Sequence, residues 1–207
     1  MYLDKYLRDY LNELASDQPT PGGGSAAALS GALGAGLACM VARLTLGKAG
    51  YAEVQTEIET LIQRTEQLRV RFQQLMQEDI DAYGRLSACF KLPRSTSEEK
   101  AARTKAIQER LVEAALVPME VAESAVELIK CCKRIAEIGN ANVLSDVATG
   151  TMLASSAATG ASWMVRTNLK AMKDAARVKE LDERLHVALD SISTGSQEVI
   201  SIVGGRA

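Results

Sequence analysis

Residues 19–25 read Pro-Thr-Pro-Gly-Gly-Gly-Ser, and an uncharged run from Ala26 to Ala42 follows them. Two prolines and three glycines predict a loop, and Ser25 is a suitable N-cap for a helix that reaches about Gly47. Small residues recur every four positions on two adjacent faces of this helix, Ala27, Gly31 and Ala35 on one and Ala28, Ala32 and Gly36 on the other. Neighbouring helices can therefore pack backbone to backbone. The pattern predicts either the central helix of a bundle or a helix at a subunit interface.

The glycine triplet itself has two interpretations. Backbone N–H groups at a helix start can approach a ligand closely, and the helix dipole favours negative charge there. A tight turn before a core helix uses the same residues, and a single glycine-rich loop does not decide between the two.

Length, composition and charge limit the classes of protein that this chain can belong to. Its 207 residues predict a single domain, 1–207, and its net charge of −2 gives no reason to expect nucleic-acid or membrane binding. No signal-peptide pattern follows the initial Met-Tyr-Leu-Asp-Lys. The four cysteines lack the spacing of a disulfide framework or a metal site, so we expect reduced thiols in the cytoplasm. With His186 as the only histidine, we expect no metal.

Two uncharged runs, Ala26–Ala42 and Val147–Val165, approach the length of a membrane span. Both consist mainly of Ala, Gly, Ser and Thr, which gain little from lipid, so we expect buried helices instead.

Hydrophobic spacing predicts an all-α fold, an elongated bundle of about six helices. Their expected bounds are residues 3–15, 26–47, 52–90, 95–138, 143–172 and 175–203. The helices over 26–47 and 143–172 are rich in small residues, which suggests a dimer. The fourth helix opens with overlapping capping boxes in Ser95-Thr-Ser-Glu-Glu99. Pro118 lies inside it, where it should leave one carbonyl without its helical donor and kink the helix.

Asp79 is the strongest candidate for chemistry. The apolar seam of the helix over 52–90 turns this carboxylate inward among apolar and small residues. A buried carboxylate has a raised pKa or a partner, and Tyr83 lies one turn further along. It is either a functional group or a structural hydrogen-bonding residue. Asp81 falls on the polar side and is expected to be solvated.

A second polar group precedes the helix over 143–172: Asn140, Asn142, Ser145 and Asp146. These residue types are good helix caps, and on spacing alone capping is the better interpretation. They could also line a pocket. Asn168 interrupts the far end of the same helix, while Lys48, Lys91 and Arg94 end apolar elements and could bind anions.

Several motifs in this order resemble the cyclodeaminase domain of formiminotransferase-cyclodeaminase and the free-standing bacterial methenyltetrahydrofolate cyclohydrolases. They are Pro21-Gly-Gly-Gly-Ser-Ala-Ala-Ala28, Leu44-Thr-Leu-Gly-Lys48, Asp79-Ile-Asp-Ala-Tyr83, Lys91-Leu-Pro93, Val117-Pro-Met-Glu-Val-Ala-Glu123, Gly139-Asn-Ala-Asn142 with Ser145-Asp146, and Asn168-Leu169. Together they span nearly the whole chain. Two departures from the family pattern are Trp163 and Gly84.

The resemblance implies a cytoplasmic homodimer that acts on one-carbon derivatives of tetrahydrofolate, polyglutamylated forms included, with no cofactor beyond that substrate. Asp79 is the first catalytic candidate that it implies and Asp146 the second. The substrate-binding candidates are Gly22, Gly23, Gly24, Ser25, Lys48, Tyr83, Lys91, Pro93, Asn140, Asn142, Ser145 and Asn168.

A different class of function stays open at this point. In a non-catalytic helical assembly protein, the small-residue helices would only build an interface, and Asp79 would be a structural contact.

Overall fold

The computed structural model describes residues 2–206, and its regular structure is entirely helical within that range. Six α-helices follow one another: α1 (Leu7–Leu14), α2 (Gly23–Arg43), α3 (Gln55–Cys89), α4 (Ser97–Ile138), α5 (Leu144–Ala171) and α6 (Ala175–Arg206). Short 3-10 helices cover Tyr2–Asp4, Ala49–Val54 and Ala141–Val143. The predicted all-α bundle of about six helices is confirmed.

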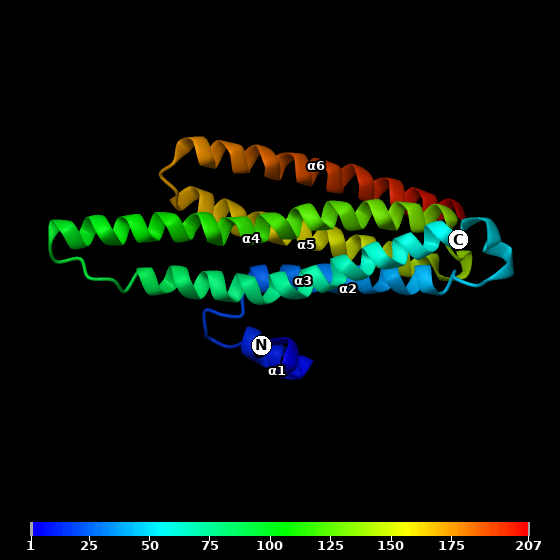
Figure 1. Ribbon diagram of the computed structural model, residues 1–207, viewed down its shortest axis with the longest axis horizontal. Coiled ribbons are helices and arrows are strands. Elements are labelled where there is room, and N and C mark those ends of the chain that lie inside the picture. Colours follow the sequence, from blue (N-terminus) through cyan, green and yellow to red (C-terminus); the bar gives the residue numbers. More distant parts are fainter. Residues whose placement is uncertain (1, 207) are drawn as a thin grey trace.

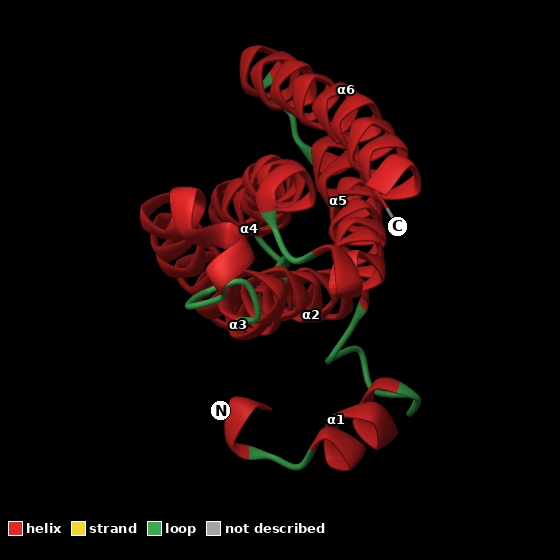
Figure 2. Ribbon diagram, turned by 90° about the vertical axis from the view of Figure 1, so that its right-hand side faces the viewer, coloured by secondary structure: helices red, strands yellow, loops and turns green. Residues whose placement is uncertain are grey.

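The five long helices lie roughly side by side in an elongated bundle, and α1 stands apart from it near the N-terminus (Figure 1). With 42 residues, α4 is about 63 Å long at 1.5 Å per residue. It begins with a capping box between Thr96 and Glu99, as its sequence predicts, and continues through Pro118 as one helix. Viewed along the bundle, α2, α3, α4 and α5 surround the core, and α6 covers α4 and α5 (Figure 2).

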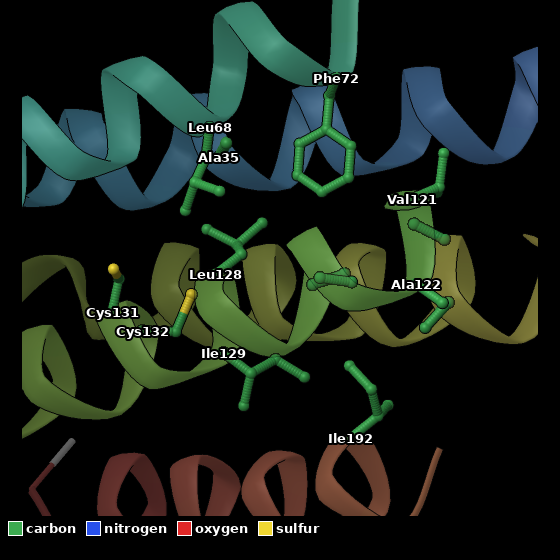
Figure 3. Packing of buried hydrophobic residues seen from close by; sticks show 14 of the residues in the cluster. Ala35, Leu68, Phe72, Val121, Ala122, Leu128, Ile129, Cys131, Cys132 and Ile192 are labelled. Atoms are coloured by element: carbon green, nitrogen blue, oxygen red, sulfur yellow. The ribbon is translucent and has the colours of Figure 1, made fainter. Parts of the chain in front are cut away.

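The core consists of the apolar seams of these helices. Phe72 of α3 and Leu128 of α4 are completely buried between their helices, while Ile129 on the other side of α4 points toward Ile192 of α6 (Figure 3). Cys132 is also buried there, and burial raises the pKa of its thiol to about 12. The thiol is therefore protonated and unreactive at neutral pH.

The two small-residue helices, α2 and α5, pack directly against each other. A Cβ atom on Gly34 would lie 2.7 Å from the Gly150 carbonyl oxygen, and one on Gly150 would lie 3.0 Å from that of Gly34. The Ser30 hydroxyl also donates to the Leu153 carbonyl across this contact, at 2.9 Å. Close backbone approach between α2 and α5 thus depends on glycine at the crossing.

One prediction about α2 needs correction. Its N-cap is Gly22, not Ser25, and the helix ends at Arg43 rather than near Gly47. Gly47 has a positive φ of 74° in the turn beyond. The helix therefore starts inside the glycine triplet, and Gly24 leaves room for the Asp79 side chain over its first turn.

The sequence also predicts that this helix is either central in a bundle or at a subunit interface. The structure shows how far it is buried within one chain, and the interface stays a prediction. α4 contacts all four of the other long helices, whereas α2 contacts α3, α4 and α5. α2 has the length and composition of a membrane span, but 61% of its most apolar 18-residue stretch is buried inside the bundle. It keeps an uncharged outer face on which Leu33 is 55% exposed and Met40 is 38% exposed.

The glycine crossing gives a stability prediction. Gly34→Ala should lower the free energy of unfolding by about 1 to 3 kcal/mol, because the added methyl group meets backbone that cannot move aside. Gly84→Ala is the matched control, since nothing lies within 4 Å of a Cβ there and alanine favours the helix by about 1 kcal/mol. Chemical denaturation of both variants measures the difference, and equal stability would contradict the proposed role of the crossing.

Candidate active site

A cavity of about 360 Å³ lies at the N-terminal end of α2. Its wall comes from four distant parts of the chain: the loop before α2, the last turns of α3, the middle of α4 and the end of α5. Most of the lining is apolar, including Leu86, Leu111 and Met164. The polar lining side chains are Thr20, Asp79, Tyr83, Thr167 and Asn168. Its volume and its few polar groups are typical of a small-molecule site.

Asp79 lies directly against the first turn of α2. A Cβ atom on Gly24 would overlap the Asp79 carboxylate, so only glycine allows this approach. The backbone N–H of Ser25 donates to the carboxylate. Gly22, Gly23 and Gly24, which are binding candidates from the sequence, line the cavity together with Asp79.

Burial is the main influence on the ionisation of Asp79. Loss of solvent raises the pKa of its carboxyl group to about 6, and the hydrogen bond from Ser25 opposes part of that rise. No arginine, lysine or histidine forms an ion pair with it among residues 2–206. A carboxyl group with this pKa is about 90% ionised at pH 7 and can still exchange its proton, as a general acid–base group must.

Ser25 lies behind the cavity and not in its lining. Its side chain is fully buried, and its hydroxyl donates to the Gly22 carbonyl at 2.9 Å. The Tyr10 hydroxyl lies 3.2 Å from the same Ser25 oxygen. Since that oxygen already donates to Gly22, Tyr10 is the donor, and α1 thereby supports the turn beneath Asp79.

Two more predicted residues line the cavity. Tyr83 does so while its side chain stays 41% exposed, and it forms no hydrogen bond with Asp79. Asn168 directs its side-chain nitrogen to the carbonyls of Ala114 and Met164, at 2.8 and 3.0 Å. Asp81 is exposed and accepts a hydrogen bond from Gln77, so its predicted position on the polar side is confirmed.

The second polar group lies at the opposite end of α2, about 30 Å away for a helix of 21 residues. Asn140 is buried and caps the 3-10 helix, because its side-chain oxygen accepts from the Asn142 N–H. Its side-chain nitrogen donates to the Leu44 carbonyl. Capping, the better interpretation on spacing alone, is confirmed for Asn140.

The other residues of that end are more open to solvent. Lys48, Asn142 and Ser145 are exposed, and Asp146 is partly exposed in the first turn of α5. In a single chain none of them can reach a molecule bound beside Asp79. Their predicted roles in catalysis or binding therefore need a second subunit.

Lys91 and Pro93 belong to the exposed link between α3 and α4. They follow Phe90, which does line the cavity. Neither is part of the cavity wall, and of the two only Lys91 can meet charged groups that emerge past Phe90.

Sequence reasoning missed several residues of the wall. Thr20 belongs to the quoted stretch, but its role depends on the path of the loop. Met164 and Thr167 carry no local signal, because their contribution follows from how the end of α5 lies beside α2: a Cβ on Gly23 would be 3.5 Å from the Met164 side chain.

The other surface hollows are less suited to chemistry. A groove of about 520 Å³ between α4 and α6 is rimmed by charged groups that pair with one another, such as Glu123 with Arg184 at 2.9 Å. Another, between α3 and α4, contains the pair Arg85–Glu113. No grouping of His, Cys, Asp or Glu suited to a metal ion occurs in residues 2–206.

A family model described as formiminotransferase-cyclodeaminase matches residues 6–187, which include the complete wall of the cavity. The chain belongs to this family. The resemblance inferred from the sequence motifs is therefore confirmed.

Individual members of the formiminotransferase-cyclodeaminase family are similar over most of the chain. A methenyltetrahydrofolate cyclohydrolase of Methylorubrum extorquens is 39% identical over 180 residues, which cover 85% of this chain and 86% of that protein. The formimidoyltransferase-cyclodeaminase of Rattus norvegicus is 31% identical over 99% of this chain, and the match covers 38% of the rat protein. The crystal structure of a formiminotetrahydrofolate cyclodeaminase from Thermotoga maritima matches with a TM-score of 0.90 and 29% identity, covering 99% of this chain and 98% of that one.

The two departures from the family pattern lie outside the cavity wall. Trp163 is 60% exposed on α5, beneath the Arg166 guanidinium, whose central carbon is 5.7 Å from the ring centroid. Gly84 faces open space on α3. Within one chain, neither changes the shape of the site.

The raised pKa of Asp79 predicts a pH-dependent stability. Because the folded state holds this proton up to about pH 6 and the unfolded chain only to about pH 4, ionisation of Asp79 destabilises the fold as pH rises through that window. Asp79→Asn should therefore be more stable than the parent at pH 7, by about 1 to 3 kcal/mol, and nearly equal to it at pH 4.

Denaturant unfolding at pH 4, 5, 6 and 7 measures the gap. The control is Asp81→Asn. Because its carboxylate is exposed, its difference in stability from the parent should not grow as pH rises. A gap that stays constant with pH would show that the Asp79 carboxyl titrates normally.

Proposed function

We propose that this chain is a tetrahydrofolate one-carbon enzyme whose active site is the cavity around Asp79. It hydrolyses 5,10-methenyltetrahydrofolate to 10-formyltetrahydrofolate, forms 5,10-methenyltetrahydrofolate from 5-formiminotetrahydrofolate with release of ammonia, or does both. The single observation that carries the proposal is the Asp79 carboxylate, which lies in an apolar cavity with no cationic partner from residues 2–206. The names of its relatives favour this class over a non-catalytic assembly protein.

Both reactions pass through a carbon that carries positive charge shared between two nitrogens. An ionised carboxylate in a poorly solvated cavity stabilises such a cation strongly. For hydrolysis, Asp79 also accepts a proton from the water that attacks this carbon. The protonated carboxyl group then donates to the nitrogen that leaves when the ring C–N bond breaks. The proton left on the adduct's hydroxyl group is released to solvent as the formyl C=O forms.

The same group serves the reaction that releases ammonia. The second folate nitrogen attacks the formimino carbon and loses its proton, while the departing nitrogen gains protons and leaves as ammonia. Asp79 can accept the first proton and donate to the leaving group, because its pKa of about 6 lies close to physiological pH.

The cavity also suggests how the substrate is oriented. Its volume of about 360 Å³ suits the fused ring and the reacting carbon rather than a complete folate with its tail. The tail would then leave the cavity past Phe90 toward Lys91, the next residue in the chain, whose side chain is exposed. Lys91 is better placed than Lys48 to meet tail carboxylates within one chain, and a polyglutamate tail would meet Arg94 as well.

We further propose that the protein acts in the cytoplasm as a homodimer through the outer face of α2. That face carries no charge between Ser25 and Ala42 and exposes Leu33 and Met40. A second copy is the occupant that an uncharged face of this length favours, and a dimer could bring Lys48 and Asp146 of one subunit toward the cavity of the other.

Asp79→Asn tests the catalytic proposal, because it keeps the shape of the side chain and removes its charge and its proton acceptor. Turnover should fall by on the order of 10² to 10⁴. Loss of the near-ultraviolet band of methenyltetrahydrofolate reports hydrolysis, and its appearance from the formimino compound reports release of ammonia. Asp81→Asn should keep nearly full activity. If Asp79→Asn turns over both compounds like the parent, the carboxylate is structural.

Leu33→Glu tests the dimer. A buried charge at the interface should shift the mass measured by light scattering from two chains to one, without loss of helical circular dichroism. Val187→Glu is the matched control, because Val187 is 67% exposed on α6 and away from α2. A parent protein that is monomeric over a wide range of concentration would overturn the dimer.

A further inference from the structure

Pro118 leaves a gap in the hydrogen bonding of α4. Proline has no N–H group, so the carbonyl of Ala114, four residues earlier, has no helical donor. Ala114 is buried, and its carbonyl would be costly to leave unpaired. The missing donor comes from α5, where the side-chain nitrogen of Asn168 lies 2.8 Å from that oxygen.

This contact decides which way the Asn168 amide points. Both hydrogens on its nitrogen are used, one by Ala114 and one by the Met164 carbonyl at 3.0 Å. Turning the amide over would place its oxygen against two carbonyl oxygens and leave Ala114 without a donor. The orientation is therefore fixed by the neighbours and not by solvent.

The amide oxygen is the atom of Asn168 that stays available. No side chain or backbone group in residues 2–206 donates to it, and Asn168, Ala114 and Met164 all line the cavity. The hydroxyl of neighbouring Thr167 is already committed to the Trp163 carbonyl at 2.8 Å. Because Asn168 lines the cavity and its nitrogen is held by two carbonyls, its neutral amide oxygen is the group left to accept from a bound molecule, in addition to the carboxylate of Asp79.

We propose that Asn168 determines specificity by accepting a hydrogen bond from an N–H group of the bound molecule, and that Pro118 is the positioning residue that orients it. The inference rests on the proposed function, since a reduced pterin presents N–H and amino donors on its ring. A ligand with an acceptor at that position would face the Asn168 oxygen unpaired and be rejected.

A structural role for Asn168 must be separated from this one, because Asn168→Leu removes both the acceptor and the donor to Ala114. Pro118→Ala provides the separation: alanine restores a helical N–H to the Ala114 carbonyl without touching the cavity. The double variant Asn168→Leu/Pro118→Ala should therefore recover the thermal stability that Asn168→Leu loses.

The kinetic result should not recover with it. We expect Asn168→Leu to lower kcat/KM for methenyltetrahydrofolate or the formimino compound about tenfold, mainly through KM, equally at pH 5.5 and pH 8 because the acceptor is neutral. The double variant should keep that raised KM while its Tm returns to the parent value. Pro118→Ala alone should raise KM by less than Asn168→Leu does. Gln67→Leu, which removes an exposed amide from α3, is the control and should change neither quantity.

Each outcome has one meaning. A KM that returns to the parent value together with Tm in the double variant would show that Asn168 acts only on the fold and would overturn the inference. An unchanged KM in Asn168→Leu, with an active parent, would overturn it as well while leaving the proposed function intact. A parent that turns over neither compound would overturn the proposed function and the inference with it.

Discussion

The contact between Asp79 and the first turn of α2 is the constraint on which the site depends. It requires glycine at position 24, because any side chain there would occupy the place of the carboxylate. It also requires the helix to start at Gly23, so that the Ser25 N–H reaches Asp79. A carboxylate at a helix N-terminus usually has a lowered pKa, yet here burial outweighs the helix dipole and the hydrogen bond. The carboxyl group is therefore mostly ionised at neutral pH although its burial favours the protonated form.

Glycines at two further positions allow close contacts that hold α2 in place. On one side Gly31 accommodates Phe72 of α3, whose ring would lie 2.5 Å from an added Cβ, and on the other Gly34 meets the backbone of α5. α2 is thereby fixed between two helices at short distance, with its glycine-rich start held beside the ends of both. Precision at the cavity follows from close packing along the helix, since a bulkier residue at either contact would move the first turn away from Asp79.

Much of this arrangement could be predicted from the sequence, because it follows from periodicity. The inward position of Asp79 and the exposed position of Asp81 both result from the apolar seam of α3, and the start of α4 follows from its capping box. The start of α2 could not be predicted, since Ser25 is a better cap than Gly22 by residue type, and only the presence of Asp79 over the turn decides otherwise. Met164 and Thr167 were missed for a related reason: they enter the site through tertiary packing, which leaves no local pattern. The residues around Asn140 and Asp146 do have a local pattern, but it is ambiguous, because the same short polar residues at a helix start serve as caps and as pocket lining.

The cavity wall is drawn from segments that are more than 140 residues apart in the sequence, from Pro19 to Ala171. No single hairpin of the bundle contains enough of the wall to hold a ligand, so the site exists only after α2, α3, α4 and α5 have all docked. A ligand that binds there stabilises only the fully assembled bundle, so its binding shifts the folding equilibrium toward that state. Substrate supply would in this way protect the protein from local opening and from the proteases that depend on it.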